Sequence, residues 1–146
     1  MRIQLEHTNI KVPSIAKSEK FLLAAFEDFK VRGTGFAEEF GYWSHVGNES
    51  TYIALLQRDK PGTETAVKVA PYSHNNHYRL MHVGIVVEDI EALIGRLRQA
   101  GFKPSLSDGL NSNPHRRNIY FSDDNGLEWE FVQYMTNDSA LKNNYL

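Results

Sequence analysis

The chain has 146 residues, 41% hydrophobic and 23% charged, with a net charge of −2, which is typical of one globular domain or two small modules and excludes disordered and collagen-like chains. The absence of cysteine excludes disulfides, iron–sulfur clusters and cysteine nucleophiles. With no basic block, no long apolar run and no signal-peptide pattern in the first ten residues, we expect a cytoplasmic protein without nucleic-acid or membrane partners.

The first half of the chain begins with a predicted strand over residues 2–12. Ser14 takes the position of a helix N-cap, and Ile15, Leu22 and Ala25 then fall on one helical face. Short predicted strands follow around 29–36, 41–47 and 51–57, and the last two are joined by a turn at 47–50.

The second half repeats this order of elements. A predicted strand at 80–87 leads to Asp89 as N-cap and to a helix whose apolar positions are spaced as on one face, and Gly101 ends that helix. Predicted strands follow at 102–107, 117–122 and 127–134, with a turn at Asp123-Asp124-Asn125-Gly126. We therefore divide the chain into a module at 1–57, a linker at 58–79, a module at 80–135 and a tail at 136–146.

Two ungapped matches show that the halves are copies of one unit. Residues 5–15 lie over 80–90 at an offset of 75, which aligns His7 with His82, and residues 50–57 lie over 126–133 at an offset of 76. Nearly equal offsets of half the chain length favour a tandem repeat over chance. The predicted fold class is α+β, a tandem βαβββ repeat in which two modules form a cupped mixed sheet with helices outside.

This pattern resembles the vicinal oxygen chelate superfamily, which includes glyoxalase I, extradiol dioxygenases and bleomycin-resistance proteins. The resemblance covers nearly the whole chain and is most specific in the paired His7 and His82 and in the hairpin from Tyr120 to Phe131, although the family's proline after the first turn aspartate is missing. It implies that His7, His82 and Glu130 face one cavity and bind a divalent metal, with Fe(II) favoured and Mn, Ni or Zn as alternatives.

The residues themselves support this metal site. Alternation along the last strand places Trp129 and Phe131 under the helices and turns Glu130 the other way, where a carboxylate needs a partner. Two imidazoles and one carboxylate form a set that holds a divalent metal and leaves one side open. The alternative is that both histidines are half-exposed strand residues and that Glu130 is a solvated glutamate.

The position equivalent to Glu130 in the first unit is Ala54, which has no donor atom. Glyoxalase-type members usually have a fourth ligand there, so the three remaining ligands resemble those of extradiol dioxygenases. Gln57 is a substitute ligand only if a bulge shifts the strand, because it lies on the opposite strand face from Ala54.

Other candidate site residues surround this set. Tyr120 resembles the tyrosine with which extradiol enzymes bind a substrate hydroxyl, and the alternative is a non-catalytic aromatic residue. Tyr42, Trp43 and Tyr52 are a candidate aromatic wall, and Arg117 with His115 is a candidate anion contact; ordinary packing and solvated loops are the alternatives. Four histidines are candidate acid–base groups: His45, His74, His77 and His115.

These residues predict a metalloenzyme that binds a small, oxygenated, catechol-like substrate through vicinal oxygens, with oxygenative ring cleavage as the first interpretation. A glyoxalase-type lyase or isomerase is the second, and a metal-free drug-binding or resistance protein is the third. The enzyme class therefore stays open between dioxygenase and lyase. The small sheets also predict a homodimer formed through sheet edges and the aromatic sheet from Tyr42 to Tyr52.

Overall fold

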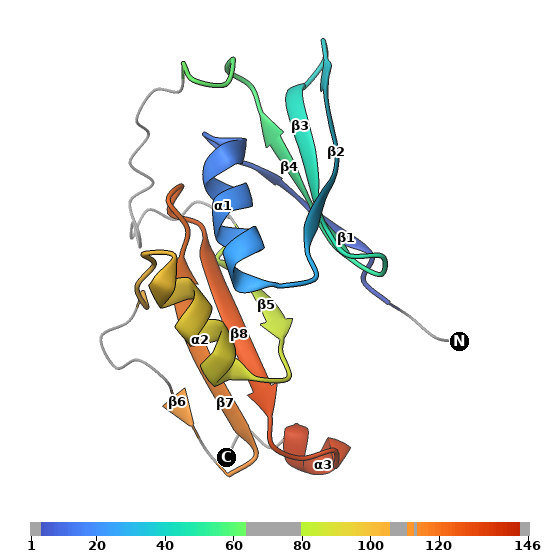
Figure 1. The fold of residues 1–146 in the computed structure, drawn as a ribbon. Helices are drawn as coiled ribbons and strands as arrows, with labels where there is room; N and C mark the ends of the chain where they lie inside the picture. Colours follow the sequence, from blue (N-terminus) through green and yellow to red (C-terminus); the bar gives the residue numbers. More distant parts are fainter. Residues whose placement is uncertain (1–3, 64–79, 106–110, 113, 144–146) are drawn as a thin grey trace. The chain divides into compact units, whose positions relative to one another are not determined.

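Two βαβββ modules follow one another in the computed structural model, which describes residues 4–63, 80–105, 111–112 and 114–143. The chain divides into two compact units, Met1–Val69 and Ala70–Leu146 (Figure 1). The predicted α+β tandem repeat is confirmed.

The first unit consists of β1 (His7–Lys11), α1 (Ile15–Ala25), β2 (Lys30–Ala37), β3 (Gly41–Gly47) and β4 (Tyr52–Gln57). Its sheet has the strand order β1-β4-β3-β2, with β1 parallel to β4 and the other pairs antiparallel. The register between β2 and β3 shifts between Val31 and Gly33, so Arg32 lies at an irregular position of the edge strand. Helix α1 packs against one face of this sheet through β3 and β4.

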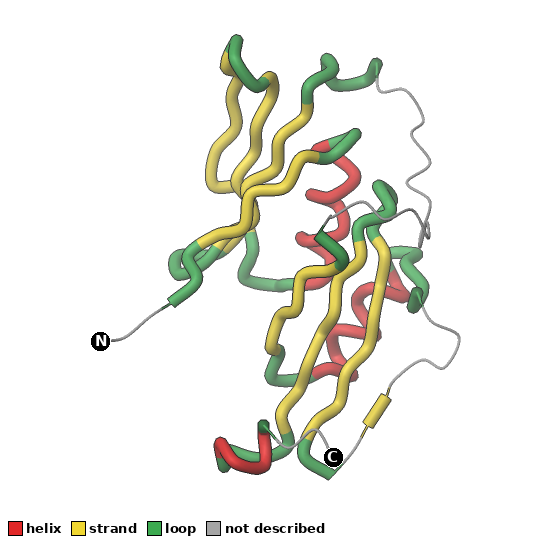
Figure 2. Tube along the Cα trace, turned by 180° about the vertical axis from the view of Figure 1, so that it is seen from behind, coloured by secondary structure: helices red, strands yellow, loops and turns green. Residues whose placement is uncertain are grey.

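The second unit consists of β5 (His82–Val86), α2 (Ile90–Gln99), β6 (Asn111–Ser112), β7 (Arg116–Ser122) and β8 (Glu128–Tyr134), and α3 (Ser139–Lys142) follows it. Its strand order, β5-β8-β7-β6, repeats that of the first unit, again with one parallel and two antiparallel pairs. Trp129 and Phe131 are fully buried, as the alternation of β8 predicted. Helix α2 covers the face on which they lie, and Figure 2 shows the opposite face.

The first N–H group of α1 and that of α2 each bind a glutamine from the last strand of the same unit. The Ile15 N–H donates to Gln57 Oε1 at 2.7 Å, whereas the Ser14 side chain makes no capping hydrogen bond. In the second unit, Ile90 N–H donates to Gln133 Oε1 at 3.4 Å, and Asp89 also caps the helix as predicted. The repeated glutamines thus connect strand and helix in both units, because the first N–H groups of a helix lack partners within it.

In the hairpin turn of each unit, one side-chain oxygen accepts hydrogen bonds from two backbone N–H groups. Asn48 Oδ1 accepts hydrogen bonds from Ser50 and Thr51 N–H at 2.9 and 3.0 Å, and Asp123 Oδ1 accepts from Asn125 and Leu127 N–H at 2.9 and 3.0 Å. Such side-chain acceptors fix a tight turn by replacing backbone partners. The turns set the register of the strands that carry the candidate site.

The predicted strand at 102–107 is wrong within its described part, residues 102–105. Only Pro104 forms an isolated bridge, to Phe121, and the strand at this edge is β6. Proline has no N–H to donate to a ladder, which limits pairing at this point. Residues 64–79 of the predicted linker, with His74 and His77, lie outside the described residues. No helix in the described part of the chain is long and apolar enough to cross a membrane.

Candidate functional site

Three strands of the second unit bring polar side chains together on the face opposite α2. Directly paired strand residues share a face, and the pairs Gly84–Glu130 and Tyr120–Glu130 place Glu130 between β5 and β7. His82 comes two residues before Gly84 and therefore lies on the same face. Gly84 leaves this face open beside Glu130, since a Cβ there would lie 3.7 Å from Glu130 Oε2.

The two oxygens of Glu130 have different partners. His82 Nε2 lies 3.3 Å from Oε2, and Asn118 Nδ2 donates to Oε1 at 2.9 Å. The Glu130 side chain is 15% exposed, and Asn118 is buried. Asn118 therefore fixes the rotation of the carboxylate and directs Oε2 toward His82.

Tyr120 completes this cluster. Its ring meets the His82 ring edge-on with centroids 5.6 Å apart. Burial raises the pKa of Tyr120 above its ordinary value, and a hydrogen bond to the Glu130 carboxylate raises it further. The phenol therefore keeps its proton at neutral pH and is a hydrogen-bond donor on this face.

The first unit carries an aromatic ladder on the face opposite α1. The His7 ring stacks on Tyr52 with centroids 4.8 Å apart, Tyr52 contacts His45 at 4.8 Å, and His45 contacts Trp43 at 4.9 Å. Glu6 Oε2 lies 2.8 Å from His7 Nδ1. A carboxylate at Nδ1 favours the tautomer whose Nε2 carries the lone pair, and this is the form that binds a metal.

His45, a candidate acid–base group, lies in this ladder. It pairs with Ala54, just as Tyr120 pairs with Glu130, so the two residues hold equivalent places in the repeat. Burial, followed by the charges of Arg32 and His7, lowers the pKa of His45 below its ordinary value of 6.5. The imidazole is therefore neutral at pH 7 and able to accept a proton.

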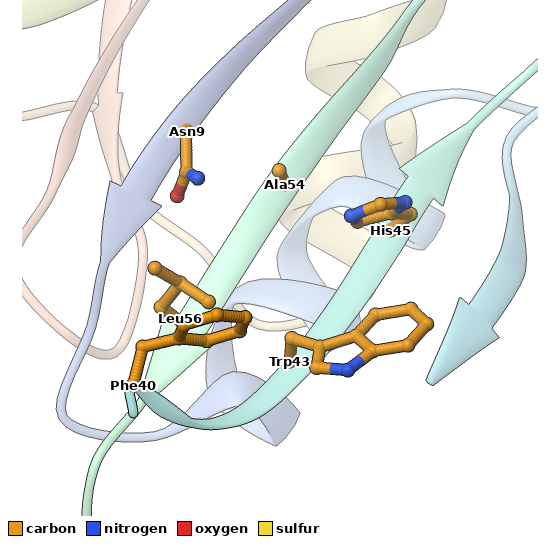
Figure 3. Close-up of a pocket in the computed structure, with 6 residues that line it drawn as sticks. All are labelled: Asn9, Phe40, Trp43, His45, Ala54 and Leu56. Carbon is orange, nitrogen blue, oxygen red and sulfur yellow. The ribbon is translucent and has the colours of Figure 1, made fainter. Parts of the chain in front are cut away.

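A hollow of about 340 Å³ opens beside the ladder (Figure 3). Its lining comes from β1, β3, β4 and the turn before β3: Asn9, Phe40, Trp43, His45, Ala54 and Leu56. Four of these residues are apolar, while Asn9 and His45 supply the polar atoms. The volume is at the low end of the range for small-molecule pockets, roughly 300–1,000 Å³.

The sequence profile of the Glyoxalase/Bleomycin resistance protein/Dioxygenase superfamily matches residues 4–131 of the chain. The chain belongs to this superfamily. A comparison with curated proteins gives no match. The resemblance drawn from the paired histidines and the last hairpin is therefore confirmed at the level of the superfamily.

Several solved structures share this fold at low sequence identity. A glyoxalase family protein from Enterococcus faecalis has a TM-score of 0.66 at 19% identity, over 88% of this chain and 96% of that one. The fosfomycin resistance protein FosX from Listeria monocytogenes, complexed with Mn(II) and sulfate, gives 0.59 at 14% identity over 96% and 99%. TnmS3, an antibiotic-binding protein from Streptomyces sp. CB03234, gives 0.60 at 18% identity over 92% and 98%.

Ala54 and Gln57 have the orientations that alternation predicts. Ala54 lines the hollow on the face of His7, whereas Gln57 is buried on the helix face and bonded to Ile15. Gln57 Nε2 also donates to the Asp59 carbonyl at 3.0 Å. Both polar ends of Gln57 are thus engaged in holding the fold, and the side chain does not reach the face of His7.

Two predicted substrate contacts lie elsewhere. Tyr42 pairs with Gln57 and contacts Phe36, so it is on the helix face and does not join Tyr52 in a wall. Arg117 forms an ion pair with Glu91 of α2, again on the helix face. His115 precedes β7, where its carbonyl accepts the Met135 N–H at 2.9 Å. Tyr52, by contrast, lies beside the predicted metal ligand His7, as Tyr120 does beside His82.

The three predicted metal ligands come from both units. His82 and Glu130 are neighbours in the second unit, and His7 belongs to the first. Within the part of the chain that the structure describes, no three His, Asp or Glu side chains gather at one metal position. The full set of His7, His82 and Glu130 therefore stays a prediction.

Proposed function

We propose that this member of the superfamily is a metal-dependent enzyme that binds a small substrate through two neighbouring oxygen atoms. His7, His82 and Glu130 would hold one divalent metal. The observation that carries the proposal is the short distance of 3.3 Å between two potential metal-binding atoms, His82 Nε2 and Glu130 Oε2. Two donors at about 2.1 Å from one metal lie roughly 3.0–3.4 Å apart.

The donor set fits a divalent metal. Imidazole and carboxylate suit Fe(II), Mn(II), Ni(II) and Zn(II), and three ligands leave positions open for substrate. Glu6 on His7 and Asn118 on Glu130 supply the outer hydrogen bonds that orient such ligands. The Mn(II) complex of FosX, which shares the fold, supports the same class of metal. When bound, the metal would polarise the substrate oxygens and neutralise charge that develops on them.

The residues around the site favour two kinds of chemistry. Ala54 supplies no fourth ligand, which favours oxygenation with Fe(II), our first interpretation from the sequence. The position of neutral His45 on the face of His7 supports the second interpretation, a lyase or isomerase in which His45 would accept the proton that is moved. In both, Tyr120 would donate a hydrogen bond to a substrate oxygen as negative charge develops.

Metal titration of the purified, EDTA-treated protein tests the proposal. By calorimetry, we expect the wild type to take up one Mn(II), Fe(II) or Zn(II) ion per chain. His7→Ala, His82→Ala and Glu130→Gln should each weaken binding at least about tenfold, because each removes one of three ligands. His115→Ala is the matched control and should bind as the wild type does.

The competing candidate is a metal-free binding protein, which the apolar hollow and the fold shared with TnmS3 favour. Absence of saturable metal uptake by the wild type would contradict the metalloenzyme proposal and support this candidate. If His82→Ala and Glu130→Gln lose metal uptake while His7→Ala binds metal as tightly as the wild type, the assignment of His7 as a ligand is contradicted.

A further inference from the structure

Arg32 presents a positive charge on the face of His7. Its guanidinium lies 4.5 Å from the centroid of the Tyr52 ring, which in turn contacts both His7 and His45. The register shift between Val31 and Gly33 gives Arg32 this irregular place on the edge strand. Bulges commonly redirect one side chain of a strand in this way.

No carboxylate among the described residues forms an ion pair with Arg32. Glu49, whose pKa Arg32 helps to lower, is bound first to Lys30, with Nζ 2.8 Å from Oε1. Glu6 is engaged by His7. An arginine that stacks on an aromatic ring and keeps its fork of N–H donors open is well suited to a planar anion.

The hollow lies along the same ladder. His45 lines the hollow and contacts Tyr52, and Tyr52 contacts Arg32, so these two rings lie between the hollow and the guanidinium. Phe40, Trp43 and Leu56 give the hollow its apolar character. One end of the ladder thus suits an apolar ring, and the other end suits a negative charge.

We propose that the substrate is a small aromatic anion whose ring occupies this hollow and whose carboxylate, or similar planar anionic group, binds Arg32. The proposal deepens the proposed function and rests on it for the identity of the site as a substrate site. It assigns the anion contact to Arg32, a role that the sequence interpretation gave to Arg117. Arg117 is instead bound to Glu91.

Binding of three small molecules to metal-free protein tests this substrate class. Benzoate has both a ring and a charge, benzamide has the ring without the charge, and acetate has the charge without the ring. Trp43 lines the hollow, so quenching of tryptophan fluorescence reports occupancy, and Trp43→Phe identifies the part of the signal that comes from this residue. We expect benzoate to bind at least about tenfold more tightly than benzamide or acetate.

Variants separate the two parts of the proposal. Arg32→Gln should weaken benzoate binding about tenfold and leave benzamide unchanged, because it removes only the charge contact. Ala54→Leu should weaken benzoate and benzamide alike, because it fills the hollow. Arg98→Gln, which removes an exposed charge from α2, is the matched control and should behave as the wild type.

The proposal is overturned if benzoate gives no saturable quenching, or if Arg32→Gln binds benzoate as tightly as the wild type. Equal binding of acetate and benzoate would exclude a ring in the hollow. These measurements are made without metal, so they are independent of the metal titration. Arg32→Gln should retain wild-type metal uptake, which separates failure of this inference from failure of the proposed metal site.

Discussion

Neighbouring strand residues in this protein differ sharply in surroundings. Glu130 lies between Trp129 and Phe131, yet both of these are fully buried while Glu130 meets His82, Asn118 and Tyr120 on the other face. A carboxylate between two core aromatic residues avoids the cost of burial because side chains alternate along the strand. Glu130 therefore lies on the opposite face, where hydrogen-bond donors are present. The same alternation separates His45 from the buried Ser44 and Val46.

The titration of His45 gives a prediction at this scale. Burial lowers its pKa most, and Arg32 is the largest charged contributor. Arg32→Gln should therefore raise the pKa of His45 toward 6.5 without restoring it fully, because burial remains. Histidine ring signals followed by NMR against pH would measure this, with His115 of the second unit as an internal control. An unchanged or lower pKa of His45 in the variant would contradict the placement of Arg32.

The sign of the effect on stability follows from this lowered pKa. Below pH 6.5 the unfolded chain takes up a proton at His45 before the folded protein does. The contribution of neutral His45 to stability is therefore present above pH 6.5 and is lost as the pH falls through the folded pKa. Arg32→Gln should narrow the pH range over which this stability is lost, since it brings the pKa of His45 in the folded protein closer to that in the unfolded chain.

At the scale of elements, a glutamine side chain connects the last strand of each unit to the start of its helix. Gln57 is 1% exposed and bridges Ile15 at the start of α1 to the carbonyl of Asp59. In the second unit, Gln133 makes the equivalent bond to Ile90 at the longer distance of 3.4 Å and is partly exposed, while Asp89 shares the capping. The first helix therefore depends more on its glutamine than the second does.

We predict that Gln57→Met lowers the free energy of unfolding by about 1–3 kcal/mol, because it leaves the buried Ile15 N–H without this acceptor. Gln133→Met, the matched substitution, should cost less than about 1 kcal/mol. Urea unfolding followed by circular dichroism measures both. If Gln133→Met loses more free energy of unfolding than Gln57→Met, the greater dependence of α1 on its glutamine is contradicted. Loss of metal uptake in folded Gln57→Met would restore Gln57 as a ligand candidate.

The repeat offset and strand alternation predict most of these elements from the sequence. They predict helices α1 and α2, seven of the eight strands in the described part of the chain, and the faces of Ala54, Gln57, Trp129 and Phe131. Alternation also separates two predicted contacts from the site: Tyr42 is adjacent to Trp43, and Arg117 is three residues before Tyr120, so each lies on the opposite strand face from that residue.

The positions of His45 and Arg32 could not be read from the chain alone. His45 faces Ala54 only through the register of β3 and β4, and Arg32 reaches Tyr52 from a local shift in the register of β2. Register depends on turn geometry and on packing across strands, which a single sequence does not specify. The placement of these two side chains thus depends on pairings between strands, whereas the predicted faces follow from patterns within one strand.

At the scale of the whole molecule, the repeat leaves apolar surface on the edge strands. Each four-stranded sheet has two edges, formed by β1 and β2 in the first unit and by β5 and β6 in the second. Phe36 on edge strand β2 is 59% exposed, and Phe40 beside β3 is 48% exposed. Unpaired edges with exposed aromatic residues favour association with a second chain, which also protects them from uncontrolled pairing.

We therefore predict a two-fold homodimer that buries more than about 1,000 Å² in total. The chain mass is 16.7 kDa, so light scattering at micromolar protein should give a mass of about 33 kDa. Phe36→Glu should shift the mass toward that of one chain, because it places a charge on the predicted edge contact. Leu23→Glu makes a similar change at a 41% exposed position on α1 and should leave the dimer intact. A wild-type mass near 17 kDa would exclude the dimer and would require His7, His82 and Glu130 to meet within one chain.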